Sequence, residues 1–128
     1  ADTDANGHMY FANYLVVADE VMSDYWAELG WDFNKLHEQP ALTFSVNANI
    51  DFISECLAGD TVEVAVGFSR VGSSSLTATY EMRNLRTGEA AARGTFTSVF
   101  VAKSTRKSMP IPADFRAAIL QRQPELVD

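Results

Sequence analysis

The sequence is short of the features that mark secreted and membrane proteins. Cys56 is its single cysteine, so no disulfide can form within the chain, which fits a reducing compartment. The apolar runs are too short to span a bilayer, and no signal peptide is visible. We therefore expect a cytoplasmic protein that has no membrane partner.

Positive charge is also scarce. The chain has 10 Lys and Arg against 17 Asp and Glu, which gives a formal net charge of −7 at pH 7. A chain with this balance has no overall field for nucleic acid or an anionic membrane, although a local basic patch can still bind a phosphate group. Nucleic acid is therefore not an expected partner.

The composition is that of an ordinary globular protein. Hydrophobic residues make up 47% of the 128 residues and charged residues 21%. The length suits one domain, and no repeat or linker interrupts it, so we expect residues 1–128 to form a single domain. The chain begins with Ala1 rather than Met, which leaves open that a preceding segment, such as a targeting segment, was trimmed.

Two segments have the pattern of helices. Residues 14–29 carry apolar side chains at intervals of three and four, which predicts a long helix with one apolar face that ends at Gly30. Residues 113–122 follow two prolines and predict a short final helix.

Between these helices the apolar period changes to two. In residues 42–52 the even positions are apolar and the odd positions polar, which predicts a long strand with one dry face. Three further strands are predicted from about Val62, Leu76 and Ala90, separated by tight turns. Short connections of this kind favour an antiparallel meander.

The element order predicts an α+β fold in which one long helix packs on a four-stranded sheet. A helix is only about 10 Å wide, whereas four strands span roughly 15–19 Å. The sheet must therefore curl around the helix, or leave apolar edges for a partner subunit.

The stretch DTDANGHMYFANY, which begins at Asp2, has three possible interpretations. The first is an EF-hand calcium loop, because Asp2, Asp4, Asn6 and Gly7 match its first ligand positions. However, the twelfth position needs a bidentate carboxylate and is Asn13 here, so the ligand set is incomplete.

The second interpretation is a simple turn, because Asp, Asn and Gly are turn formers. The third is a catalytic turn, because the stretch leads directly into the long helix. The unpaired N–H groups at a helix start attract developing negative charge, and a carboxylate beside them suits acyl transfer.

The same stretch resembles the signature of the hotdog-fold acyl-CoA thioesterases, in the branch of 4-hydroxybenzoyl-CoA thioesterase. That signature is Asp-x-Asp-x-x-Gly, a short apolar stretch and then Asn-Tyr, here Asp2, Asp4, Gly7, residues 9–11, Asn13 and Tyr14. The resemblance extends to NIDFISECLAGDTVEV, GEAAARGTFTSVFVA and PIPADFRAAI, and so covers almost the whole chain. It implies one central helix wrapped by a curled antiparallel sheet. The family has a strand before the motif, which we expect to be trimmed or lost here.

The resemblance also implies catalytic roles. Asp4 matches the carboxylate that attacks the thioester carbonyl or activates a water molecule, and Asp2 holds the turn. Phe11 matches the residue whose backbone N–H polarises the thioester carbonyl. His8 lies beside the turn and is a candidate for positioning water or the carboxylate.

Several other residues are candidates for substrate binding. Asn13 and Tyr14 either contact substrate or serve in capping and packing. Lys103, Arg106 and Lys107 form a basic stretch that is expected either to receive the phosphates of coenzyme A or to be a solvated loop.

These observations predict a thioesterase that acts on an acyl-CoA or an acyl carrier protein thioester. We expect no metal and no cofactor other than the coenzyme A carried by the substrate. The alternative is a non-catalytic hotdog module that binds acyl groups or serves in assembly. Because one helix cannot cover the sheet, and family members pair their sheets edge to edge, we expect a homodimer or homotetramer.

Overall fold

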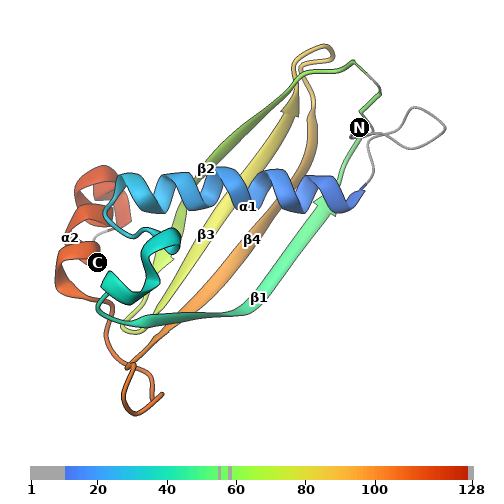
Figure 1. The fold of residues 1–128 in the computed structure, drawn as a ribbon. Helices are drawn as coiled ribbons and strands as arrows, with labels where there is room; N and C mark the ends of the chain where they lie inside the picture. The colour runs from blue at the N-terminus through green and yellow to red at the C-terminus, as the bar shows by residue number, and fades with distance from the viewer. Residues whose placement is uncertain (1–10, 55, 58, 127–128) are drawn as a thin grey trace.

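The computed structural model of the chain describes residues 11–54, 56–57 and 59–126, and describes the side chains from residue 16 onward (Figure 1). Its elements in chain order are α1 (Phe11–Glu28), η1 (Phe33–Glu38), β1 (Leu42–Phe52), β2 (Val62–Val71), β3 (Ser75–Asn84), β4 (Ala90–Val101), α2 (Ala113–Arg122) and η2 (Pro124–Leu126).

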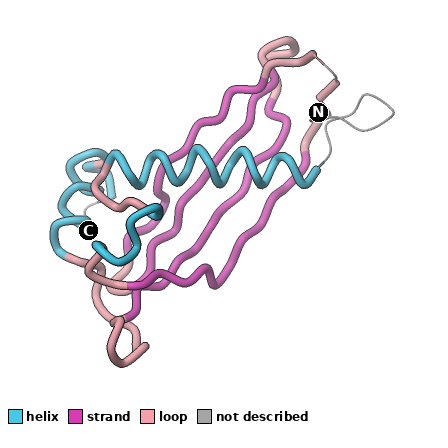
Figure 2. The backbone as a smooth tube through the Cα atoms, in the orientation of Figure 1, coloured by secondary structure: helices cyan, strands magenta, loops and turns pink. Residues whose placement is uncertain are grey.

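The four strands form one antiparallel sheet in the order β1-β4-β3-β2, and α1 crosses one face of it (Figures 1 and 2). This confirms the expected α+β arrangement of one long helix against a curled antiparallel sheet. The bounds of β1 and α2 are those predicted, whereas α1 begins three residues earlier than the apolar spacing indicated. No helix among the described residues is long and apolar enough to cross a bilayer.

The prediction of a complete meander was wrong for one strand. β2, β3 and β4 are neighbours in chain order, but β1 lies next to β4 rather than next to β2. The chain between β1 and β2, residues 53–61, therefore passes across the end of the sheet. Three strand spacings amount to about 14 Å, which nine residues of loop span without strain.

The prediction of one dry face along β1 was also wrong. The pairing of β1 with β4 shifts between Ser45 and Asn47, so Val46 is a bulged residue. A bulge exchanges the two faces of a strand for every residue beyond it. Phe44 pairs with Val99 on the face away from α1, whereas Ala48 pairs with Phe96 on the face toward it.

The core is aromatic and lies between α1, β2, β4 and α2. The indole of Trp26 stacks on Phe100 with a centroid distance of 6.1 Å and contacts Phe115 at 5.2 Å. Trp26 and Trp31 are 3% and 2% exposed, so both are packing residues. Burying an aromatic side chain of this size contributes roughly 1.5–3 kcal/mol, so this cluster anchors α1 to the sheet.

Tyr80 connects β3 to the edge strand β1 across β4. Its hydroxyl donates to the backbone carbonyl of Asn49 at 2.8 Å, and its ring stacks on Phe96 at 5.0 Å. The ring lies over Gly94, where an added Cβ would meet the Tyr80 hydroxyl at 2.5 Å. Burial, with a smaller effect of the Asp51 charge, raises the pKa of Tyr80 to about 12, so this hydroxyl keeps its proton at neutral pH.

α1 covers only part of the sheet. It packs most closely on β2 and β3, whereas it faces the first part of β1 across a cavity. On β1, Val46 at the bulge and Phe52 are 60% and 48% exposed, and Phe44, which lies on the face away from α1, is 46% exposed. The sheet therefore curls and also leaves an apolar edge, as the width of a single helix predicted.

Candidate functional site

The residues predicted to be catalytic lie at the start of the chain. Asp2, Asp4 and His8 are outside the described residues, as are the other positions of the calcium-loop interpretation up to Gly7. Phe11 is the first residue of α1, and Asn13 and Tyr14 lie in the first turn of that helix.

The start of α1 is suited to developing negative charge. The first N–H groups of a helix have no intrahelical acceptor, and in α1 these include the N–H groups of residues 11–13. No acidic side chain lies in this first turn, so no charge of the helix itself offsets the positive end of its dipole. A carbonyl oxygen that becomes negative can therefore be stabilised at this position.

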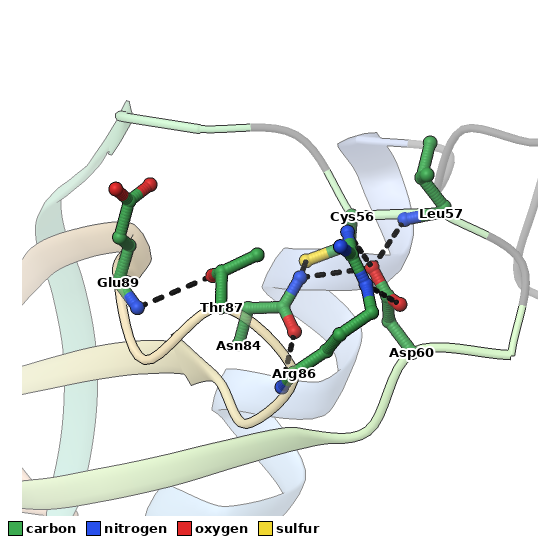
Figure 3. Close-up of polar contacts among 7 residues, drawn as sticks. All are labelled: Cys56, Leu57, Asp60, Asn84, Arg86, Thr87 and Glu89. Atoms are coloured by element: carbon green, nitrogen blue, oxygen red, sulfur yellow. Dashed lines mark hydrogen bonds and ion pairs between the residues drawn. The ribbon is translucent and has the colours of Figure 1, made fainter.

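The turns at the end of the sheet are joined by a polar cluster around Asp60 (Figure 3). The Asp60 carboxylate accepts from Arg86 Nε at 2.6 Å, from the Leu57 backbone N–H at 2.7 Å and from Asn84 Nδ2 at 2.8 Å. Asn84 Nδ2 also lies 3.7 Å from Cys56 Sγ, and its Oδ1 accepts from the Arg86 N–H.

These contacts occupy the Asp60 carboxylate fully. Its side chain is only 5% exposed, and the hydrogen bond from Arg86, followed by those from Leu57 and Asn84, holds its pKa well below the usual range. We read Asp60 as the residue that fixes the loop between β1 and β2 against the turn between β3 and β4.

A cavity of about 290 Å³ lies between the middle of α1 and the sheet. Its lining combines aromatic rings, hydroxyls and one carboxylate, among them Trp26, Phe33, Phe96, Ser23, Thr43, Ser45, Ser98 and Asp19. The Trp26 Nε1 group is buried and has no hydrogen-bond partner among the described residues. Cavities of about 150 Å³ admit benzene, so this one has room for a substituted two-ring group.

These lining residues were not predicted from the sequence. Thr43 and Ser45 were predicted to lie on the polar face of the strand. Because of the bulge at Val46, the odd-numbered residues before it face α1, whereas after it the even-numbered residues do. The available signal was weak, because a bulge at an ordinary residue leaves no mark in an alternating pattern.

The predicted phosphate-binding stretch lies in the loop after β4. Lys103 Nζ donates to the carbonyls of Leu36 and His37 at 3.4 and 3.3 Å, while Arg106 has a positive φ of 62°. β1 and β4 pair from Leu42–Val101 to Phe52–Ala92, ten residue steps, or about 34 Å. The basic loop is at the opposite end of these strands from Phe52, near which Figure 1 draws the start of α1.

Within one chain, the fold therefore does not bring Lys103, Arg106 and Lys107 to the start of α1. No group of three or more His, Cys, Asp or Glu side chains that could hold a metal ion occurs in the described part of the chain.

Comparisons with known proteins place this geometry in context. A family model described as the thioesterase-like superfamily matches residues 1–119. The 1,4-dihydroxy-2-naphthoyl-CoA hydrolase of Thermosynechococcus vestitus is 32% identical over 126 residues, which are 98% of this chain and 85% of that protein.

Solved structures share the fold. A 1,4-dihydroxy-2-naphthoyl-CoA thioesterase from Synechocystis has a TM-score of 0.81 at 24% identity, covering 92% of this chain and 87% of that one. A Thermus thermophilus thioesterase complexed with coenzyme A and Zn has a TM-score of 0.80 at 24% identity, covering 96% and 86%. At this level of identity the structural match supports the hotdog architecture alone.

Proposed function

The chain belongs to the thioesterase-like superfamily, and we propose that it hydrolyses an acyl-CoA thioester in the cytoplasm. The relative from Thermosynechococcus vestitus supports 1,4-dihydroxy-2-naphthoyl-CoA as the first substrate to test. A two-ring hydroxylated acyl group also agrees with the size and the polar lining of the cavity beneath α1. An acyl carrier protein thioester is the alternative form of the same substrate.

In the proposed mechanism, Asp4 attacks the thioester carbonyl carbon to form an anhydride that water then hydrolyses, or it takes a proton from a water molecule that attacks the same carbon. In either route the C–S bond breaks and coenzyme A leaves as its thiol, while the acyl group leaves as the free acid. The carbonyl oxygen becomes negative and accepts the Phe11 N–H, and His8 positions the water or the carboxylate. The observation that carries this proposal is that α1 begins at Phe11 without an acidic residue in its first turn. A backbone donor of this kind stabilises the transition state by about 3 kcal/mol.

A hydrolysis assay with a panel of acyl-CoA thioesters and a thiol-trapping reagent tests the activity. Asp4→Asn keeps the shape of the side chain and removes its charge, so kcat should fall about 100-fold or more with little change in KM. Asp2→Asn is the matched control and should change kcat far less. An Asp4→Asn protein that turns over at the parent rate would refute the mechanism and favour a non-catalytic acyl-binding module.

The proposed reaction needs no metal. A chelator should leave both the rate and the stability of the parent protein unchanged. Loss of either with chelator, restored by Ca²⁺, would instead support the calcium-loop interpretation of the Asp2–Gly7 stretch.

We propose further that two copies pair along β1 into a homodimer, or a tetramer of such dimers. β1 is eleven residues long, and no described strand other than β4 pairs with it. Exposed apolar side chains lie on the strand and on the loop after it, including Val46, Ile53 at 50% and Leu57 at 43% exposure. A long apolar edge of this kind is a pairing site, and an antiparallel pair about a twofold axis uses the same edge twice. Sedimentation that finds only a well-folded monomer at micromolar concentration would refute the pairing.

Antiparallel pairing of β1 with its copy would bring the basic loop of one protomer close to the start of α1 in the other, although the two lie far apart within one chain. The Leu42 end of the partner's strand would lie beside the Phe52 end of the first. The basic loop and the cavity of one protomer would then approach the start of α1 in the other. The proposed site is therefore shared between two subunits.

A further inference from the structure

Two stacked aromatic rings, those of Phe96 and Tyr80, form one side of the cavity beneath α1. Phe96 of β4 lines this cavity, as does Ala78 of β3, with which Phe96 pairs. Tyr80 follows Ala78 by two residues, so its side chain is on the same face of the sheet. Its ring stacks on that of Phe96, with 5.0 Å between the centroids and 26° between the planes. Tyr80, which is 2% exposed, therefore supports a ring that a bound molecule would contact.

The absence of a side chain at Gly94 allows this arrangement. Gly94 is the residue of β4 that pairs with Tyr80. A Cβ added at Gly94 would lie 2.5 Å from the Tyr80 hydroxyl and 2.8 Å from its Cζ, and it would also clash with the backbone carbonyl of Asn49. The Tyr80 ring therefore occupies the space that a side chain at this position of β4 would fill.

The Tyr80 ring is held at both ends. Its backbone belongs to β3, and its hydroxyl donates to the backbone carbonyl of Asn49 on β1, on the far side of β4, at 2.8 Å. Burial raises the pKa of Tyr80 to about 12, so the donor proton is present at neutral pH. Rotation of the ring away from Phe96 would break this buried hydrogen bond. The orientation of Phe96 is therefore fixed by contacts that involve three strands.

The opposite side of the cavity is also aromatic. Trp26 of α1 and Phe33 of η1 line it, and their ring centroids are 5.1 Å apart. In the described part of the chain neither of these rings contacts that of Phe96, so the cavity separates the two aromatic surfaces. A flat ring that enters this space can stack on Phe96, because offset stacking of aromatic rings is favourable.

We propose that Tyr80 is a positioning residue that makes this cavity selective for flat aromatic acyl groups. The inference rests on the proposed thioesterase function and names the feature that selects its substrate. Because Tyr80 already holds Phe96 in one orientation, a flat acyl group can stack without first ordering that ring, which reduces the entropy lost on binding. An aliphatic acyl group has no ring plane to align, so it gains less from a fixed Phe96. Tyr80 should therefore affect the choice of substrate more than the reaction.

Replacing Tyr80 by Leu or by Phe separates the effect of the ring from that of the hydroxyl. Selectivity is measured as kcat/KM for naphthoyl-CoA divided by kcat/KM for hexanoyl-CoA. Tyr80→Leu removes the ring that supports Phe96 and should lower this ratio roughly three- to tenfold, the range for loss of one aromatic stacking contact. The change should be in KM for naphthoyl-CoA with kcat nearly unchanged, because Phe96 contacts the acyl group equally before and in the transition state. Tyr80→Phe keeps the ring and should retain most of the ratio.

Binding of naphthoic acid, measured by calorimetry, gives a second readout that needs no hydrolysis. Its affinity should fall by a similar factor in Tyr80→Leu. Gly94→Ala should have the same effect with Tyr80 intact, because the added Cβ displaces the ring. If Tyr80→Leu does not fold, Tyr80→Met takes its place, since a flexible thioether fills more of the vacated space. A parent protein that binds naphthoic acid but hydrolyses neither thioester would refute the proposed function, while the binding measurements would still test the role of Tyr80.

Tyr25→Leu is the matched control. Tyr25 is a second buried tyrosine, whose ring lies 5.3 Å from Phe68 and whose hydroxyl donates to Gln123 at 3.0 Å, but it does not line the cavity. Its replacement should leave the ratio and the affinity unchanged, and thermal unfolding should show that each variant is folded. The proposal is overturned if the parent does not bind naphthoic acid, or if a folded Tyr80→Leu protein keeps the parental ratio and affinity. It is equally overturned if Tyr25→Leu lowers both as much.

Discussion

A mixture of two variants, each impaired toward acyl-CoA at low substrate concentration, offers a sharp test of the shared site. The first variant carries Asp4→Asn and keeps its basic loop. The second keeps Asp4, and Lys103, Arg106 and Lys107 are changed to Gln. If the site is shared, the Asp4 of the second variant works with the basic loop of the first. A mixed dimer then contains one complete site, although the homodimer of either variant contains none.

Within one chain, about 34 Å separates the basic loop from the Phe52 end of β1, so one chain cannot complete the site by itself. Because this distance is about the full length of the strand, no small movement within one chain can close it. Random exchange of equal amounts makes about half of all dimers mixed, and each mixed dimer has one complete site of two. The mixture should therefore recover about a quarter of the parental activity at the parental KM.

Refolding or slow exchange of the two variants, followed by an acyl-CoA hydrolysis assay at low substrate, measures the recovery. The same acyl group on pantetheine serves as the control. It should be hydrolysed by the second variant alone, since that variant lacks only the phosphate contacts. Activity of the mixture that equals the mean of the two separate variants at every substrate concentration would refute the shared site.

Three further predictions concern the edge strand β1, the Tyr80 hydrogen bond to it and the polar cluster around Asp60. Val46→Lys places a charge on the open edge of β1 and should give a folded monomer in sedimentation, whereas Leu85→Lys, at an equally exposed turn position, should leave the oligomer intact. Tyr80→Phe removes one buried hydrogen bond, about 1 kcal/mol. With an unfolding entropy on the order of 2 cal/mol/K per residue, the Tm should fall by roughly 4 °C, and an unchanged Tm would mean that the bond contributes nothing. Because Arg86 depresses the pKa of Asp60 in the folded protein, the stability contributed by this carboxylate is present above its unfolded pKa. It is lost as acid protonates it, so the parent should lose stability below about pH 4 more steeply than Asp60→Asn does, and parallel unfolding curves would contradict this.

Much of the fold was predictable because helices and strands leave local periodic patterns. The alternation over residues 42–52 predicted the bounds of β1, and the residues after Pro112 predicted those of α2. The family was predictable from the motif around Asp4, and the match to the thioesterase-like superfamily confirms it. The roles of Asp4, His8 and Phe11 stay predictions, because they concern the segment at the edge of the described residues.

The arrangement of these elements depended on contacts between residues far apart in the chain. The periodicity of β1 says nothing about which strand lies beside it, and only the long pairing from Leu42–Val101 to Phe52–Ala92 places it next to β4. The bulge at Val46 is equally invisible in an alternating pattern, because an inserted residue changes the phase of the faces without changing the residue types.

The same limit applies to the site. A basic stretch that follows the last strand can be recognised from composition, but its distance from the catalytic turn is set by strand length and direction. The role of Asp60 likewise arises only where two turns, 24 residues apart in sequence, meet at one end of the sheet. The sequence thus determined which elements form and which chemistry they carry, since both depend on neighbouring residues. The tertiary structure alone decided which faces, edges and charges lie together, because these depend on pairing across the whole chain.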